Sequence, residues 1–422
     1  MSGARAARIS GFSDRGTQFA TQVGVLGLAS FAVTLYALPH HLFPVLEPFR
    51  VGVVTAAVAG AGMLGRWFLG GPFPTAGGLR ALGLLVFVAM AALSPLWSVD
   101  PEASRWASGE AMKMALIYVA ASTLLTTPGR IRVVAWTIAL SACVPAWYGL
   151  QNYLEGTDLL EGYRTRWEGS FYDPNRLAMA LVISILLLLG LRSRLKSPMA
   201  RLAALAAIAL QATTIVLTYS RGAVLGLGLG ALFLVLAAGR SRGRALVVVA
   251  SLALGVAILA PDRFWNRTET ILTYEEDASA MGRIYAWRTA ENIIHRRPLT
   301  GVGASAFITA WASYAPGEAG PTPYVAHNLF LEVAAELGLL ALAGFCFLIC
   351  ACMRGLLRVA RVGGNSAISD EAKALFAAIG GYLVCQQFAG FMLSFFLFLL
   401  LGMATAVERY ARAEAAWKER TL

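Results

Sequence analysis

The sequence contains few charged residues and few histidines for a chain of its length. Only 14% of its 422 residues are charged, whereas 58% are hydrophobic and four are histidines. Soluble domains carry about 25% charged residues, so this composition cannot cover the surface of a water-soluble fold. The mean hydropathy is +0.64, and we therefore expect an all-α protein that crosses a membrane many times.

Several motifs that mark known enzyme classes are also missing. The sequence has no Walker A motif, no G-x-S-x-G and no H-E-x-x-H, which argues against an ATP-driven machine, an α/β-hydrolase and a zinc protease. No cofactor and no metal are expected; the alternative is a metal held by one of two acidic patterns, residues 100–102 and 275–277. The cysteines lie in or beside apolar segments, and we interpret them as reduced packing residues: Cys143, Cys346, Cys350, Cys352 and Cys385.

Apolar segments of about 20 residues suit helices that cross a bilayer. The sequence predicts about twelve such spans within a single transmembrane domain over residues 1–422, with one long loop, residues 261–327, between the ninth and tenth spans. The first span is interpreted as an uncleaved anchor, and the fourth and eleventh are short. The spans cover residues 19–38, 51–69, 79–96, 112–125, 131–150, 177–191, 202–219, 223–238, 245–260, 329–353, 374–388 and 391–407.

The net charge of +11 follows this predicted topology. With both termini on the inner side, every short inner loop carries basic residues, such as Arg192, Arg194 and Lys196 after the sixth span, and most acidic residues fall elsewhere. Such an excess of basic residues is typical of cytoplasmic loops. The positive charge is thus explained by topology and by attraction to anionic membrane lipids, and no nucleic-acid partner is expected.

Two groups of arginines lie on the outer side in spite of this bias. Arg221 stands between two strongly apolar spans, where a charge is costly unless it pairs; we predict an anion clamp, with snorkelling to lipid phosphate as the alternative. The long loop contains a helical segment at 282–295 that carries Arg283 and Arg288. An amphipathic helix on the bilayer surface is the alternative account of this segment.

Candidate polar residues also precede two of the predicted spans. His327 stands at the start of the tenth span, where an imidazole with an ordinary pKa near neutrality accepts a proton; a structural helix cap is the alternative. Glu332 and Glu336 follow on one helix face, and carboxylates within a span are functional candidates. Before the sixth span, Asn175 follows Asp173, either of which is suited to cap that helix; nearby Arg164, Arg166 and Arg176 add outer positive charge.

Arginines and one potential base on a single membrane face favour a lipid-linked diphosphate as substrate. Guanidinium groups bind phosphate bidentately and keep their charge at every physiological pH. They therefore stabilise a departing diphosphate without a divalent metal, while a neutral histidine deprotonates an incoming sugar hydroxyl. These residue types predict glycan transfer from a polyprenyl diphosphate to an acceptor at the outer face.

Several stretches resemble the O-antigen ligase and polymerase superfamily of bacterial inner membranes. They are FYDPN at 171–175, SRGA at 220–223, GRIYAWR at 282–288, PLTGVG at 298–303, HN at 327–328 and ELG at 336–338. Their order and spacing resemble the family more closely than any one of them alone. The plan of twelve spans with one large late periplasmic loop is also similar, whereas the first 150 residues carry no matching motif.

The resemblance implies an O-antigen ligase of the GT-C-like, metal-independent, inverting class. Such an enzyme moves the O-antigen from undecaprenyl diphosphate to a sugar hydroxyl of lipid A-core at the periplasmic face of the inner membrane, with both termini cytoplasmic. By position, Arg221 and Arg288 would hold the donor diphosphate and His327 would be the base. Residues implied in supporting roles, at the substrate or at the helix ends, are Arg283, Asn175, Asn328 and Glu336.

Three other functions remain open at this stage. An O-antigen polymerase uses the same donor but a lipid-linked glycan as acceptor, and a protein O-oligosaccharyltransferase accepts a Ser or Thr side chain. A secondary transporter or flippase belongs to a different class; transporters tend to have internal repeats with broken helices at mid-membrane, and the sequence contains no paired repeat. The oligomeric state is not predicted.

Overall fold

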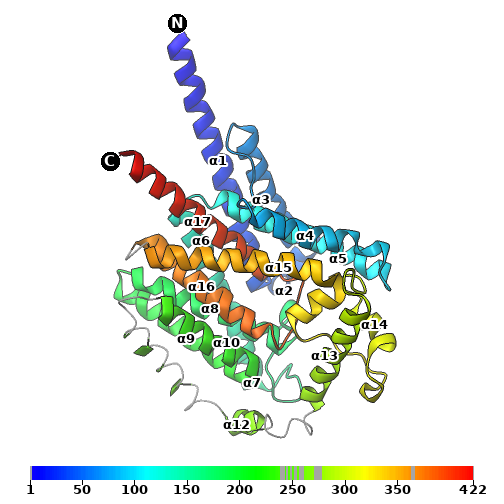
Figure 1. Cartoon of the computed structure of the whole chain (residues 1–422). Helices are drawn as coiled ribbons and strands as arrows, with labels where there is room; N and C mark the ends of the chain where they lie inside the picture. Colours follow the sequence, from blue (N-terminus) through cyan, green and yellow to red (C-terminus); the bar gives the residue numbers. More distant parts are fainter. Residues whose placement is uncertain are drawn as a thin grey trace.

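A computed structural model shows an all-helical chain (Figure 1). The structure describes residues 2–237, 261–269, 278–362 and 366–421, together with a few isolated positions between 238 and 260. Within these residues the β structure is limited to a single bridge between Leu160 and Arg164. The predicted all-α class is therefore confirmed.

The helices begin where the sequence supplies capping residues and proline. Asp100, Asp173 and Ser197 cap three of the helices, and each is followed at once by proline, which is suited to the first helical position. The α-helices are α1 (Ser2–Ala37), α2 (Pro39–Leu42), α3 (Val51–Phe68), α4 (Arg80–Leu93), α5 (Pro101–Leu124), α6 (Pro128–Ser141), α7 (Cys143–Glu155), α8 (Pro174–Leu191), α9 (Pro198–Leu217), α10 (Arg221–Ala237), α12 (Asp262–Glu269), α13 (Ala278–Arg296), α14 (Phe307–Tyr314), α15 (Leu329–Val362), α16 (Ala367–Cys385) and α17 (Phe395–Thr421).

The described residues contain six helical stretches that are long and apolar enough to cross a membrane: Arg15–Ala37, Val51–Phe68, Pro128–Glu155, Pro174–Arg194, Pro198–Leu217 and Leu329–Val362. Two shorter apolar stretches, Arg80–Leu96 and Arg221–Ala237, accompany them. The chain is a polytopic membrane protein, as predicted. The predicted fourth, eleventh and twelfth spans are parts of α5, α16 and α17, and most of the ninth, at 245–260, lies outside the described residues.

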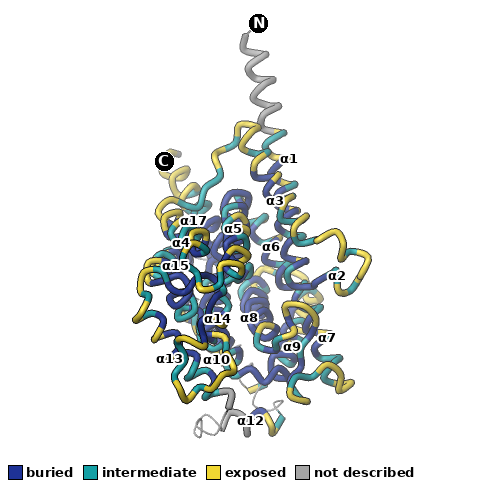
Figure 2. The backbone as a smooth tube through the Cα atoms, turned by 90° about the vertical axis from the view of Figure 1, so that its right-hand side faces the viewer, coloured by how far each residue is buried: buried dark blue, intermediate teal, exposed yellow. Residues whose placement is uncertain are grey.

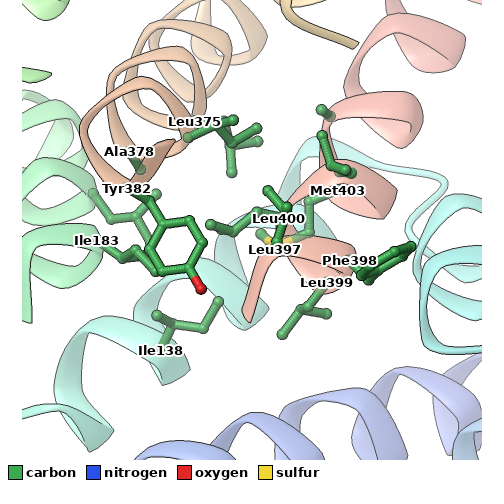
Figure 3. Close-up of a cluster of buried hydrophobic side chains, with 14 of the residues drawn as sticks. Ile138, Ile183, Leu375, Ala378, Tyr382, Leu397, Phe398, Leu399, Leu400 and Met403 are labelled. Carbon is green, nitrogen blue, oxygen red and sulfur yellow. The ribbon is translucent and has the colours of Figure 1, made fainter. Parts of the chain in front are cut away.

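Helix α8 lies at the centre of the bundle. Nearly all of its side chains are buried (Figure 2), and it packs against α6, α9, α10 and α16. A helix that is apolar on every side suits this position, because it has neighbours all round. Tyr382 of α16, Ile183 of α8 and Ile138 of α6 belong to the same core cluster (Figure 3).

Helices α13 and α14 form a second, smaller core outside the main bundle, built around Ala290, Ile293 and Trp311. This unit lies on the side of the molecule away from the two chain termini (Figures 1 and 2). The turn at residues 298–303, which lies between α13 and α14, packs against a break in α15. The predicted tenth span is thus interrupted rather than continuous.

The break in α15 is at Gly338, which has φ 83° and ψ 170°. A Cβ at this position would clash with the carbonyl group of Leu299, so glycine is required both for the backbone angle and for the close approach. The Leu339 N–H donates to the Pro298 carbonyl at 2.7 Å, and the Val302 N–H donates to the Ala335 carbonyl at 2.9 Å. The turn thereby satisfies backbone groups that the break would leave without partners.

Candidate active site

A pocket lies where the first turns of α8 and α10 meet α13 and the end of α16. The empty space between its lining residues, counted together with the open solvent at its mouth, is about 340 Å³. Two arginines that are distant in the sequence, Arg221 and Arg283, both line it. The other polar side chains in its lining are Arg164, Asn175, Tyr219 and Ser220.

Arg221 begins α10 directly after a tight link from α9. Tyr219 in this link has φ 53°, in the left-handed region, which ends α9 and reverses the chain. Ser220 donates a hydrogen bond from Oγ to Asn175 Oδ1 at 2.9 Å. The start of α10, which carries Arg221, is thereby fixed to the start of α8.

Arg164 is a pocket residue that the sequence analysis treated only as extra outer charge. Its side chain is almost fully buried, and Nε donates to the Thr218 carbonyl at 3.0 Å while Nη2 donates to Asn175 Oδ1 at 3.2 Å. Asn175 therefore accepts hydrogen bonds from both Arg164 and Ser220. The sequence signal for Arg164 is weak, because the residue lies in an irregular loop before the FYDPN stretch.

His327 stands at the turn that leads into α15. Its φ of 50° is unusual for a residue other than glycine, and Gly390 packs closely against the backbone of this turn. Asn328 caps α15, because its Oδ1 accepts from the N–H groups of Phe330 and Leu331 at 3.0 and 3.1 Å. The cap role that the sequence left open for His327 belongs to Asn328.

Burial and the positive charge of Arg283 lower the pKa of His327 to about 4, against smaller opposing effects of Asp173 and a hydrogen bond with the Ala389 backbone. The expectation that His327 titrates near neutrality is therefore wrong. Both causes disfavour the charged imidazolium. His327 is therefore neutral at pH 7, and its lowered pKa makes it a weaker proton acceptor than an ordinary imidazole.

Arg283 and Arg288 occupy different environments although both belong to α13. Arg283 lines the pocket, whereas the Arg288 side chain is 54% exposed and pairs with Glu318 at 2.7 Å. Five residues on an α-helix correspond to a rotation of about 140° about its axis. The structure therefore brings Arg221 and Arg283 together in one pocket. His327 lies outside the pocket lining but close enough to Arg283 to feel its charge, and Arg288 lies apart from both.

Glu336 lies in α15 away from the pocket lining and is buried. Its Oε2 accepts from the Ser305 N–H at 2.5 Å and its Oε1 accepts from the Phe307 N–H at 3.3 Å. A carboxylate is favourable at these N–H groups because α14 begins here and its dipole is positive at this end. Glu336 thus holds the smaller helical unit to α15.

The connection between α4 and α5, together with the first turn of α5, holds the same unit from another side. Trp97 Nε1 donates to the Thr300 carbonyl at 2.9 Å, and Ser104 Oγ donates to the Ala304 carbonyl at 2.8 Å. The motif-poor N-terminal part of the chain therefore contributes to the position of α13. No short-range sequence signal identifies this contact.

The acidic pattern at residues 100–102 does not have the contacts of a metal site in the parts of the chain that the structure describes. There, no group of three or more His, Cys, Asp or Glu is placed to hold an ion. Asp100 caps α5 through the Ala103 N–H at 3.0 Å and accepts from Thr309 Oγ1 at 2.9 Å, and these bonds lower its pKa. Residues 275–277 lie outside the described residues.

A comparison with known families places this site in context. Residues 206–346 match the family model Wzy_C, described as O-Antigen ligase, and the match includes Arg221, Arg283 and His327. Asn175 and Arg164 precede it. A comparison with curated proteins found no match. The resemblance stated from the motifs is confirmed: the chain carries a Wzy_C O-antigen ligase domain over residues 206–346.

Proposed function

We propose that this protein is an O-antigen ligase, which transfers the O-antigen glycan from undecaprenyl diphosphate to a sugar hydroxyl of lipid A-core. The family match supports lipid-linked glycans as the class of substrate. The observation that carries the proposal is the pair Arg221 and Arg283 in one pocket, next to a neutral His327.

The donor diphosphate binds between Arg221 and Arg283 in this proposal. Two guanidiniums in a partly enclosed pocket offer forked donors that match phosphate oxygens. They counter the charge that develops on the diphosphate as the glycosidic bond breaks, so that no metal is needed. The resemblance implies Arg288 as a further donor contact. Arg288 joins the clamp only if a substrate phosphate replaces Glu318 as its ion-pair partner.

His327 is the proposed base. One ring nitrogen of its neutral imidazole takes the proton of the acceptor hydroxyl, and the hydroxyl oxygen attacks the anomeric carbon from the face opposite the diphosphate. The bond between this carbon and the diphosphate oxygen breaks, and its electrons leave with the diphosphate. The products are the glycan joined to the acceptor with inverted configuration, undecaprenyl diphosphate and a protonated His327.

The membrane setting completes the proposal. We propose twelve spans in a GT-C-like arrangement in the bacterial inner membrane, with both termini cytoplasmic and the 261–327 loop periplasmic. The basic residues of the predicted inner loops support this orientation. Both termini also lie on the side of the molecule away from α13 and α14 (Figure 1).

One experiment separates the ligase from its nearest alternative. Purified protein is incubated with an undecaprenyl-diphosphate glycan and either lipid A-core or additional donor, and the lipid products are analysed by mass spectrometry. Glycan joined to lipid A-core is the expected product, whereas lengthened lipid-linked glycan identifies a polymerase. Movement of the donor across a vesicle membrane with no transferred glycan contradicts both and favours a flippase.

A further inference from the structure

Several arginines on the side of the two termini pair with buried carboxylates. Glu408 of α17 accepts hydrogen bonds from three guanidiniums, those of Arg80, Arg358 and Arg412. Glu371 of α16 binds Arg132 at 2.7 Å. These arginines have evident partners inside the fold.

Arg66, Arg130 and Arg409 differ from this pattern. Arg66 Nη1 donates to the Thr123 carbonyl at 3.2 Å, and Arg409 Nη1 donates to the Ser122 carbonyl at 2.5 Å. Arg130 Nη1 donates to the hydroxyl of Thr126, a residue that follows α5, at 2.5 Å. All three side chains thus converge on the C-terminal end of α5, and no described carboxylate forms an ion pair with them.

The positive charge of this cluster exceeds what the helix end can balance. Arg130 and Arg409 both lie close enough to act electrostatically on Arg66, and all three side chains are half-buried. The C-terminal end of a helix carries about −0.5 elementary charge. Three guanidiniums bring three positive charges, so that an additional anion is needed to balance them.

The neighbouring side chains locate the cluster at the depth of lipid headgroups. Trp67, Phe68 and Phe73 follow Arg66 and are 38, 75 and 69% exposed, and the Trp67 ring contacts the other two with centroid distances of 4.9 and 5.2 Å. Exposed aromatic residues of this kind are typical of the interface between membrane and water. An anion that reaches this level is the headgroup of a membrane lipid.

We propose that Arg66, Arg130 and Arg409 bind the phosphate of an anionic phospholipid at the membrane face that carries the chain termini. The planar guanidinium fork suits phosphate oxygens, and each of the three uses one nitrogen for its hydrogen bond to the protein. Basic residues next to a span attract anionic lipid, and the exposed aromatic side chains would contact its acyl region. This lipid site is separate from the glycan-transfer pocket.

Native mass spectrometry of the purified full-length protein tests the proposal. Detergent-solubilised protein is titrated with phosphatidylglycerol, with phosphatidylcholine as the uncharged comparator. The wild-type protein is expected to retain phosphatidylglycerol, and Arg66→Gln with Arg130→Gln is expected to bind it about 30-fold more weakly. The matched control, Arg358→Gln with Arg412→Gln, removes the same charge from the same side and is expected to keep the wild-type affinity.

Two further measurements separate lipid binding from a loss of protein stability and from the binding of a soluble anion. Arg130→Gln alone keeps both hydrogen bonds to the α5 carbonyls, and it is expected to weaken lipid binding without a change in thermal stability in lipid-free detergent. Equal binding of the two lipids, or equal loss in the control variant, overturns the proposal. Displacement of the lipid by millimolar inorganic phosphate also overturns it, because the site then belongs to a soluble anion.

Discussion

The guanidinium of Arg283 on α13 acts on the imidazole of His327 at the start of α15, and together with burial it lowers the pKa of that imidazole to about 4. The relationship has two consequences for the proposed chemistry. It keeps the proposed base neutral before substrate binds, and it places one arm of the proposed diphosphate clamp near that base. Bound diphosphate introduces negative charge that favours the imidazolium, so the basicity of His327 rises when the donor arrives.

Replacement of His327 by alanine is expected to abolish transfer. General bases contribute about 10²- to 10⁴-fold to rate, and turnover should fall by this amount while expression and donor binding stay intact. Turnover is measured with purified protein and an undecaprenyl-diphosphate glycan. His295→Ala is a matched control, because His295 is exposed on α13 and contacts the carbonyl of Glu291. Unchanged turnover in His327→Ala removes this residue from the mechanism.

Replacement of a pocket arginine is expected to reduce activity more than replacement of Arg288 on the surface. Arg221→Ala or Arg283→Ala should reduce kcat/KM for the donor by about 10²- to 10³-fold, as for the loss of a transition-state hydrogen-bond donor. Lysine should restore little, since it lacks the planar fork. Arg288→Ala is expected to have the smaller effect, because Arg288 pairs with Glu318 outside the pocket. Wild-type kinetics in both pocket variants would discard the clamp.

The pH dependence of kcat/KM reports the base in the free enzyme. Since His327 is neutral above its pKa, the profile should be flat between about pH 5 and 8 and should fall near pH 4. Arg283→Gln removes a charge that opposes protonation, so the acidic limb should move to higher pH. Arg283→Lys should keep the limb in place, as should Arg288→Gln. An acidic limb near pH 6.5 in the wild-type protein contradicts the assigned environment of His327.

Transfer is expected to survive removal of divalent ions, because the guanidiniums supply the positive charge at the diphosphate. Product formation is compared before and after treatment with EDTA, followed by repletion with Mg²⁺ or Mn²⁺. A strict requirement for an added ion would instead direct attention to the acidic pattern at 275–277 or to Asp100. Asp100→Asn then serves to distinguish these two patterns.

Glu336→Ala is expected to lower stability and activity together. The substitution leaves the N–H groups of Ser305 and Phe307 without their acceptor in a buried position, at a cost of about 1–3 kcal/mol for each group. Glu336→Gln keeps one carbonyl oxygen and should be milder. Thermal unfolding in detergent measures the effect. Normal stability with lost transfer would instead indicate that Glu336 contacts substrate.

Local signals account for what could be predicted from the chain. The apolar segments, the capping residue Asp173, and the motifs around Arg221 and His327 are each contained within a few residues. Hydrophobicity and helix-end chemistry act over that range, so the all-helical membrane class and the family followed from the sequence. The sequence also favoured His327 over the exposed His295, because Glu332 and Glu336 follow His327 on one helix face.

The sequence by itself therefore determined that this chain is a helical membrane protein with an O-antigen ligase domain. Only the tertiary structure decided that Arg283 rather than Arg288 faces the pocket, that Arg164 joins it, and that the pKa of His327 lies far below neutrality. These properties depend on the rotation of α13 about its axis and on contacts between segments far apart in the chain. The burial of a side chain and the electrostatic field that it experiences result from many such contacts. No short stretch of sequence contains these contacts.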